Sequence, residues 1–171
     1  MRQWLVVHAK PRQEAVALEH LARQGFDAWL PRASLTRRRG DRWVDRVEPL
    51  FPRYLFLAVD PDEMDVAPVR STRGCVGLVR FGDRPARVPE PLIAWLQSTA
   101  DPDTGLHLVG RAMEARLEEG ARVRILSGPF EGAEGVLQSL RGEERALVLL
   151  DVLARAARVE LPIGQLGALD A

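Results

Sequence analysis

The sequence has little of what several classes of protein require. Cys75 is the single cysteine among 171 residues, which excludes an internal disulfide and suits a reducing compartment. The longest apolar runs, Tyr54–Val59 and residues 146–150, are far shorter than the roughly 20 residues of a membrane-spanning helix. The first residues lack the basic leader and cleavage site of a secretory signal. We therefore expect a cytoplasmic protein that does not bind membranes.

Motifs for catalysis are equally scarce. The three histidines, His8, His20 and His107, have no metal-ligand spacing with one another or with the cysteine. There is no phosphate-binding glycine loop, no dinucleotide fingerprint and no nucleophile elbow. Glu48, beside an aromatic stretch, is more often a pairing group than a general base. We expect no enzymatic activity, no cofactor and no metal.

The formal net charge of zero hides an asymmetry between the two parts of the chain. Residues 1–100 carry 16 basic against 12 acidic side chains, and residues 101–171 carry 8 against 12. Lys10 is the only lysine among 24 basic residues. Either the first part meets a polyanion, or the two parts of opposite charge meet each other.

The stretch Tyr54–Val59 is apolar and rich in aromatic residues, as in a strand. Strict alternation predicts two apolar faces, because neither set of alternate residues is polar. One face would hold Phe51, Leu55, Leu57 and Val59, and the other Leu50, Tyr54, Phe56 and Ala58. Either a second layer of the same protein covers both faces, or one face awaits a partner.

The flanking pattern predicts an α+β sandwich on a mostly antiparallel sheet. Strands are expected at residues 4–9, 27–30 and 75–81, helices at 12–24 and 90–97, and a hairpin at 35–47. The tip of that hairpin, residues 37–42, is rich in arginine around a Gly40-Asp41 turn. The tip is either a solvated loop or a finger that reaches phosphates, and the sequence favours neither.

A polar stretch follows the first domain, so we expect domains at residues 1–98 and 119–171 joined by a linker at 99–118. The second domain begins with a short alternating strand at residues 120–126 and a Gly-Pro turn. Residues 146–157 satisfy two patterns, because their apolar residues suit strands while Ala, Leu and Arg favour a helix.

These features together resemble the NusG family of transcription elongation factors. The KOW signature matches Gly120, Val123-Arg124-Ile125, Gly128-Pro129-Phe130, Gly132 and Gly135-Val136. Within the family, residues 19–24, 48–56, 72–74, 79–82 and 88–89 resemble the RfaH-type specialised antiterminators. The resemblance implies a NusG-type N-terminal αβ sandwich and a small KOW domain, either a five-stranded β-barrel or, when autoinhibited, an α-helical hairpin.

The resemblance also implies a surface that docks on the clamp helices of RNA polymerase. Its residues would be His8, Leu50, Phe51, Pro52, Tyr54, Phe56, Phe81 and Ile93. The helical C-terminal domain would cover this surface, with Glu48 and Arg145 as the interdomain ion pair. On release it would form the barrel that binds a small-subunit ribosomal protein.

A second set of positions matches those with which RfaH-type proteins read the non-template DNA strand. They are Lys10, His20, Arg23, Gln24, Thr72 and Arg73, with Arg70 in addition. Cationic, amide and hydroxyl groups together can hold phosphates and accept a flipped base. Residues 65–67 replace a threonine-rich segment that contacts polymerase a second time, so the resemblance does not carry that contact over.

The sequence therefore predicts a monomeric, non-enzymatic factor that binds transcribing RNA polymerase and suppresses pausing and termination. One alternative is a general NusG-like factor without sequence-specific recruitment. The other is a ribosomal or RNA-binding KOW protein, which the acidic second part of the chain disfavours.

Overall fold

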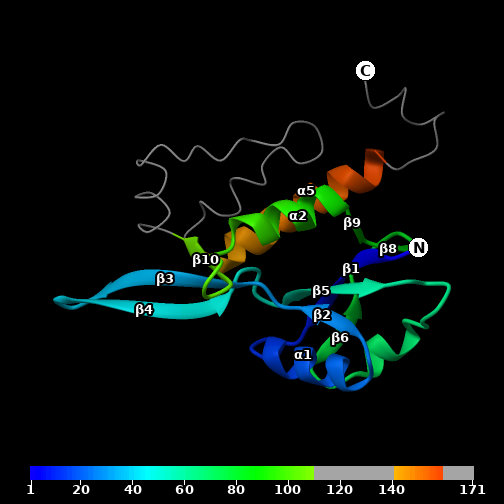
Figure 1. Ribbon diagram of the computed structural model, residues 1–171, viewed down its shortest axis with the longest axis horizontal. Coiled ribbons are helices and arrows are strands. Elements are labelled where there is room, and N and C mark those ends of the chain that lie inside the picture. Colours follow the sequence, from blue (N-terminus) through cyan, green and yellow to red (C-terminus); the bar gives the residue numbers. More distant parts are fainter. Residues whose placement is uncertain (110–140, 160–171) are drawn as a thin grey trace.

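The computed structural model describes residues 1–109 and 141–159 of the chain (Figure 1). Its helices are α1 (Glu14–Arg23), the short 3₁₀ helix η1 (Ala67–Ser71), α2 (Glu90–Thr99) and α5 (Gly142–Val159). Its strands are β1 (Gln3–Ala9), β2 (Asp27–Trp29), β3 (Arg32–Arg39), β4 (Arg42–Pro49), β5 (Tyr54–Val59), β6 (Cys75–Leu78), β7 (Arg80–Phe81), β8 (Arg84–Pro85), β9 (Arg87–Val88) and β10 (Leu106–Val109). No helix within these ranges is both long and apolar enough to cross a membrane.

The main sheet has the strand order β2-β5-β1-β6, and β9 also pairs with β1. All of these pairs are antiparallel, as the sequence predicts. Strand β5 pairs with β1 from Gln3↔Val59 to His8↔Tyr54, and both strands are almost wholly apolar. Such strands are stable only when both faces of the sheet are covered.

Helices lie on both faces of this sheet (Figure 1), and an apolar cluster fills each interface. On the first face, Leu55 and Leu57 of β5 pack with Leu21 of α1 and Val69 of η1. On the second face, the buried cluster combines residues of β1 and β5 with α2 and α5. The sandwich therefore consists of one sheet between α1 on one side and α2 with α5 on the other.

The structure corrects the predicted position of Phe51. Its side chain lies on the second face with Phe56, and their rings meet edge to face with centroids 5.9 Å apart. Alternation fails here because residues 50–53 form a turn, in which Tyr54 N–H donates to the Phe51 carbonyl at 2.9 Å. Arg53 in this turn has a φ of +74°, so the strand pattern starts only at Tyr54.

A second sheet of three strands has the order β10-β3-β4. Strands β3 and β4 form the predicted hairpin, joined by a two-residue turn in which Gly40 has a φ of +64°. Strand β10 runs parallel to β3 within the segment expected as a linker. The buried His107 stabilises β10, because its Nε2 lies 2.7 Å from the Leu96 carbonyl oxygen at the end of α2.

Residues 146–157, which suit both helix and strand, are helical in α5. The expected KOW signature at residues 120–136 and the final residues 160–171 lie outside the described residues. The segment that follows β5 contains η1, whose first turn includes Pro68.

Candidate functional site

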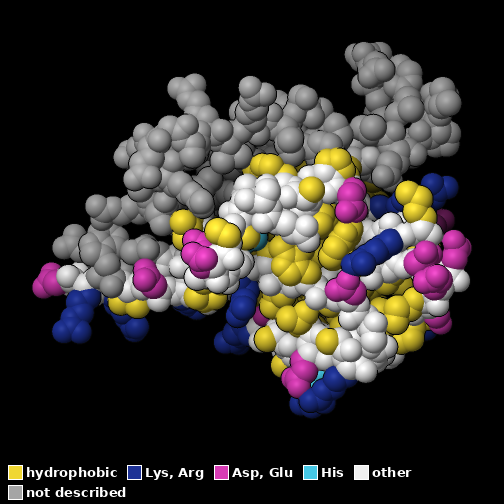
Figure 2. All heavy atoms as spheres, viewed as in Figure 1, with side chains coloured by type: hydrophobic (Ala, Val, Ile, Leu, Met, Phe, Trp, Pro, Cys, Tyr) yellow, Lys and Arg dark blue, Asp and Glu magenta, His cyan; other side chains and the backbone are white. Residues whose placement is uncertain are grey.

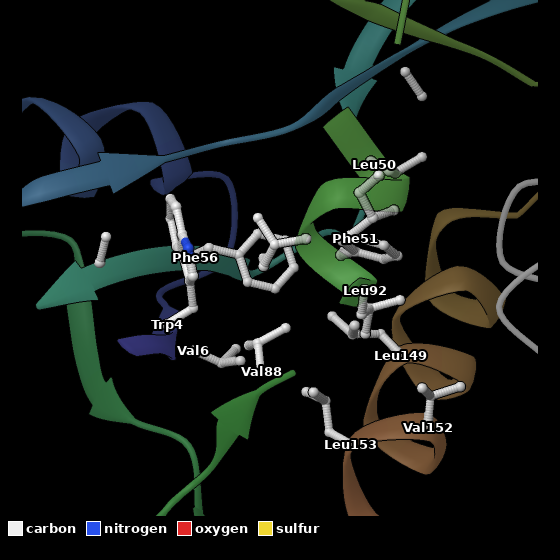
Figure 3. Packing of buried hydrophobic residues seen from close by; sticks show 14 of the residues in the cluster. Trp4, Val6, Leu50, Phe51, Phe56, Val88, Leu92, Leu149, Val152 and Leu153 are labelled. Carbon is white, nitrogen blue, oxygen red and sulfur yellow. The ribbon is translucent and has the colours of Figure 1, made fainter. Parts of the chain in front are cut away.

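Helix α5 lies across the second face of the sheet (Figure 3). Leu149, Val152 and Leu153 point from the helix into the apolar cluster and are at most 1% exposed. Their spacing of three and four residues makes one continuous stripe along a helix. The opposing surface comes from the sheet, from α2 and from the turn before β5, and includes Phe51 and Leu92.

A buried ion pair positions the first turn of α5. Arg145 is fully buried, and its guanidinium donates to Glu48 Oε1 at 2.6 Å. Its Nε also donates to the Leu50 carbonyl at 2.6 Å, and the guanidinium lies 3.4 Å from the Pro49 carbonyl oxygen. A buried guanidinium is tolerated only when such acceptors surround it. The arrangement therefore specifies where the helix begins on the sheet.

Gly142 permits close packing at the start of α5. A Cβ atom at this position would lie 2.6 Å from Pro52 Cγ, closer than atoms can pack. An open cleft of about 400 Å³ lies between α5 and the segment around Pro52 and Tyr54. Pro52, Tyr54, Leu147 and Leu150 line it. The helix is thus closely fitted at its buried stripe and loosely fitted along one edge.

The residues predicted to bind polymerase divide into two groups in this structure. Leu50, Phe51, Phe56 and Ile93 are buried in the cluster that α5 covers. His8, Pro52, Tyr54 and Phe81 are half-buried. The His8 and Tyr54 rings stack with centroids 5.2 Å apart, and burial together with the charge of Arg53 lowers the pKa of His8.

A second cluster forms where the end of α1 meets the segment around η1. The Gln24 amide donates to Thr72 Oγ1 at 2.7 Å and to the His20 carbonyl at 3.1 Å. The Thr72 hydroxyl in turn donates to the Pro68 carbonyl at 2.9 Å. Gln24 and Thr72 are 48 residues apart in the sequence. One hydrogen-bond network therefore joins two distant segments of the chain.

Gly74 explains why these two segments approach so closely. It has a φ of +83°, and a Cβ atom there would lie 2.8 Å from the backbone nitrogen of Ala17 in α1. A residue with a side chain would push the loop away from the helix. Lys10 joins the same region, because its backbone N–H donates to the Gly74 carbonyl at 2.8 Å.

The predicted DNA-binding residues differ in how accessible they are. The basic side chains Lys10, Arg23, Arg70 and Arg73 are exposed, together with Gln24, and His20 is half-buried. Arg23 pairs with Glu19 along α1 at 2.5 Å. Thr72 is buried, and its hydroxyl serves the network described above. We call these predicted DNA-binding residues, where the end of α1 meets the segment around η1, the basic edge. Thr72 is its buried residue.

The contact residues of α5 are not among the site residues that the sequence predicts. Leu149, Val152, Leu153 and Ala156 follow helical spacing, and that signal was available in the sequence. The close approaches at Gly74 and Gly142 had no such signal, because only the tertiary structure shows what a side chain there would meet.

Two further observations concern the metal-binding and thiol chemistry of the described residues. Within residues 1–109 and 141–159, no group of three or more His, Cys, Asp or Glu side chains is placed to hold a metal ion. Burial raises the pKa of Cys75 to about 11, so its thiol stays protonated near neutral pH. The described residues thus combine one apolar surface that α5 covers with one basic edge.

Comparison with known proteins identifies the family. Residues 2–97 match the family model NusG, described as "Transcription termination factor nusG", and this match spans more than half of the chain. The chain therefore belongs to the NusG family of transcription termination factors, which are non-enzymatic proteins.

The chain is also similar to individual relatives and to a solved structure. The "Transcription termination/antitermination protein NusG" of Staphylococcus aureus, in strains Mu50 and N315, is 25% identical over 175 residues, covering 96% of this chain and 94% of that protein. A solved structure titled "Domain interaction in Thermotoga maritima NusG" aligns with a TM-score of 0.36 and 19% identity, over 56% of this chain and 55% of that one.

Proposed function

We propose that this protein is a transcription elongation and antitermination factor of the RfaH type. The second face of its sheet is the surface that binds the clamp helices of RNA polymerase, and α5 is the removable cover of that surface. The observation that supports this proposal is the seating of α5, which comes from far along the chain, on Phe51, Phe56 and their neighbours. A surface as apolar as this one needs a cover when its partner is absent.

The Arg145–Glu48 ion pair supports the proposal that α5 docks at a defined position and can still dissociate from the sheet. A buried salt bridge adds little net stability, because desolvation of the two charges offsets their attraction. It does penalise any placement of the helix that leaves Arg145 without Glu48. The cleft beside Leu147 and Leu150 also means that part of the junction contributes no packing.

The dual pattern of residues 146–157 supports a change of fold on release. In this proposal residues 1–98 form the polymerase-binding domain, residues 99–118 connect it, and residues 119–171 form the KOW domain. When polymerase displaces α5, residues 119–171 adopt a β-barrel that binds a small-subunit ribosomal protein. The helical state of α5 favours this regulated factor over a general one whose C-terminal domain is always a barrel.

The basic edge around α1 and η1 is proposed to read the non-template DNA strand. Lys10, Arg23, Arg70 and Arg73 would hold phosphates, and His20 and Gln24 would contact a displaced base. Thr72 would act as a positioning residue, because its hydroxyl orients the Gln24 amide and is itself buried. The factor would act as a monomer in the cytoplasm, with polymerase and DNA as its partners.

Two leucines on α5 provide a matched test of the cover. Leu149 is 1% exposed against the sheet, whereas Leu147, two residues away, is 67% exposed. Leu149→Ala should weaken the seating of α5 by about 2–5 kcal/mol and so uncover the face more often. We expect the full-length variant to bind core RNA polymerase at least about tenfold more tightly than the unmodified protein.

The Leu147→Ala control has the same chemistry on the same helix and should leave polymerase affinity unchanged. Binding is measured by titration of labelled polymerase with each full-length protein. Weaker or unchanged binding by Leu149→Ala would contradict the proposed cover, because loss of buried packing would then not expose the polymerase surface.

The ion pair gives a second, independent test. Glu48→Gln keeps the size of the side chain but leaves the buried Arg145 charge without its counter-ion. We expect α5 to be released more often, with a gain in polymerase affinity in the same titration. Asp151→Asn removes an exposed charge that pairs with Arg155 on the same helix, and it should have no such effect.

A further inference from the structure

The turn between β4 and β5 contacts the first turn of α5, and we call its residues 50–53 the docking turn. The Leu50 carbonyl of this turn accepts the Arg145 Nε–H at 2.6 Å. Its Pro52 ring lies so close to Gly142 that a Cβ atom there would be 2.6 Å from Pro52 Cγ. Helix α5 can therefore begin at this position only while the docking turn keeps its shape.

The docking turn contains a residue in an unfavourable backbone conformation. Arg53 has a φ of +74°, and Arg12 is the other non-glycine residue with a positive φ in the described part of the chain. A side chain makes this left-handed region costly, so a residue other than glycine keeps it only when surrounding contacts hold it there. The contacts of Arg53 therefore decide whether the docking turn is stable.

These contacts come from α1 and β1. The Glu14 carboxylate, in the first turn of α1, accepts the Arg53 backbone N–H at 3.0 Å. The Ala9 N–H donates to the Arg53 carbonyl at 2.7 Å, and Arg53 Nε donates to the Ala9 carbonyl at 3.2 Å. Of these supports, Glu14 is the one that another element provides through its side chain.

Glu14 differs from the other acidic residue of α1. Figure 2 shows charged side chains at the surface over this helix. Glu19 is exposed and pairs with Arg23, also exposed, along the helix. Glu14 is only 8% exposed, and burial of a carboxylate is costly unless the group is hydrogen-bonded. The hydrogen bond from Arg53 offsets this cost and joins the carboxylate to the docking turn.

We propose that Glu14 is a positioning residue for α5. It lines the open cleft beside α5, and it acts on the helix through the docking turn, whose Arg53 it holds in the left-handed conformation. While this hydrogen bond is present, the docking turn fits the first turn of α5. Without it, the docking turn relaxes and α5 is released more often. This inference rests on the proposed function, because it concerns what controls the release of the cover.

An acidic residue in the first turn of a helix also has an ordinary explanation. Its charge interacts favourably with the positive end of the helix dipole, whatever the side chain contacts. That explanation requires the charge of Glu14 and predicts an effect on α1. The proposed role requires an acceptor of the right length and predicts an effect on α5.

Glu14→Asp and Glu14→Gln form a matched pair that separates the two explanations. Aspartate keeps the negative charge, but it is one methylene shorter, so its carboxylate should not reach the Arg53 N–H. Glutamine loses the charge, but its carbonyl oxygen has the same reach and can accept the same hydrogen bond. The open cleft gives the glutamine amide group access to water.

Amide hydrogen exchange of the full-length proteins, followed by NMR, measures how often α5 is released. We expect Glu14→Asp to raise the exchange rates of the α5 amides by about fivefold or more, as loss of a buried hydrogen-bond acceptor should. Glu14→Gln should change these rates much less. Amides in the centres of β1 and β5 should change little in either variant, because α5 opens locally.

Arg53→Gly tests whether Glu14 acts through the left-handed residue. Glycine adopts a positive φ without the cost of a side chain, so the docking turn should depend less on Glu14 in this background. We expect the effect of Glu14→Asp on α5 exchange to be at least about twofold smaller there. Arg12→Gly is the control, because Arg12 has a similar φ of +61° but lies outside the docking turn. In the Arg12→Gly background, Glu14→Asp should have its full effect.

Several results would overturn the proposal. A larger effect of Glu14→Gln than of Glu14→Asp, or an effect confined to α1, would mean that Glu14 acts through its charge on its own helix. An effect of Glu14→Asp that Arg53→Gly leaves unchanged would mean that Glu14 does not support the left-handed turn. An equal loss of protection in α5, β1 and β5 would indicate a general structural role.

These exchange measurements use the protein without polymerase, so their outcome is independent of the polymerase titrations. If Leu149→Ala gains no polymerase affinity but the exchange pattern is as expected, the proposed function is wrong and Glu14 still positions α5. If Leu149→Ala gains affinity but Glu14→Asp leaves α5 exchange unchanged, the cover stands and the inference about Glu14 is wrong.

Discussion

The two faces of the main sheet are covered in different ways. On the first face, α1 follows β1 directly and buries Leu21 against Leu55 and Leu57. Its one buried charged residue, Glu14, accepts a hydrogen bond from the Arg53 backbone N–H at 3.0 Å. On the second face, the covering helix α5 comes from about 95 residues beyond β4, and its contact includes a buried guanidinium. The packing of α1 resembles the permanent core of a domain. The packing of α5 resembles an interface whose position is determined by a charged pair.

This difference follows from what each contact must do. Apolar packing is non-directional, and its favourable free energy is roughly proportional to the apolar area buried. A buried charge contributes little net stability but makes wrong positions costly. An element that must leave and return to the same place benefits from the second kind of contact, and this is the proposed behaviour of α5.

The largest expected effect is a loss of stability on leucine truncation, and it should differ between the two faces. Leu57→Ala on the first face and Leu153→Ala on α5 remove the same side chain from fully buried positions. Leu57→Ala should lower the free energy of global unfolding by about 2–5 kcal/mol and the melting temperature by roughly 5–15 °C. Leu153→Ala should instead reduce hydrogen-exchange protection in α5 while the amides of β1 and β5 stay protected.

Equal loss of protection throughout the protein in both variants would show that the two faces belong to one cooperative core. In that case α5 would be a permanent element, and the contrast drawn above would fail.

A smaller effect is expected at Gly74, which holds the basic edge against α1. Gly74→Ala places a Cβ atom 2.8 Å from the Ala17 nitrogen at a φ of +83°, so the loop must move away from the helix. We expect destabilisation by roughly 1–3 kcal/mol and altered amide shifts at Gln24 and Thr72. Gly82→Ala is the control, because its φ of +66° is similar but no other atom lies within 4 Å. Denaturant titration and two-dimensional NMR measure both.

The smallest expected effect concerns pH and His107. Burial lowers the pKa of His107, although hydrogen bonds to the Leu96 and Arg32 carbonyl groups partly oppose this. The folded state therefore binds a proton less readily than the unfolded chain, whose histidine titrates near 6.5. Stability is complete above that pH and falls as pH decreases below it, by at most about 1.4 kcal/mol per pH unit.

His107→Gln should reduce this dependence, since glutamine can donate to the Leu96 carbonyl without titrating. The slope that remains would come from other groups, including His8, whose pKa is also lowered. Chemical denaturation of both proteins between pH 7.5 and 5.5 measures the difference. An unchanged slope would mean that His107 is not protonated on unfolding in this range.

Much of the first domain was predictable because its signals are local. The apolar run of β5 and the Gly40-Asp41 turn act over a few residues, and each lies where the pattern predicts. Phe51 was assigned to the wrong face because a turn at Arg53 interrupts the alternation. Strand β10 was missed because its polar flanks resemble a linker, while its stability comes from β3 and from the buried His107.

The candidate site likewise combines features that the sequence predicts with features that only the tertiary structure shows. The resemblance supplied its residue types, and the network of Gln24 with Thr72 appeared only in the structure. The burial of Thr72 had no sequence signal, because it depends on the approach of two distant segments that Gly74 allows.

The sequence by itself determined that residues 146–157 form regular structure, and it left helix and strand both open. The tertiary structure decided for the helix, because only a helix aligns Leu149, Val152 and Leu153 along the apolar face while Arg145 reaches Glu48. The physical reason is that propensities differ by less than a kcal/mol per residue, whereas burial of these side chains contributes several.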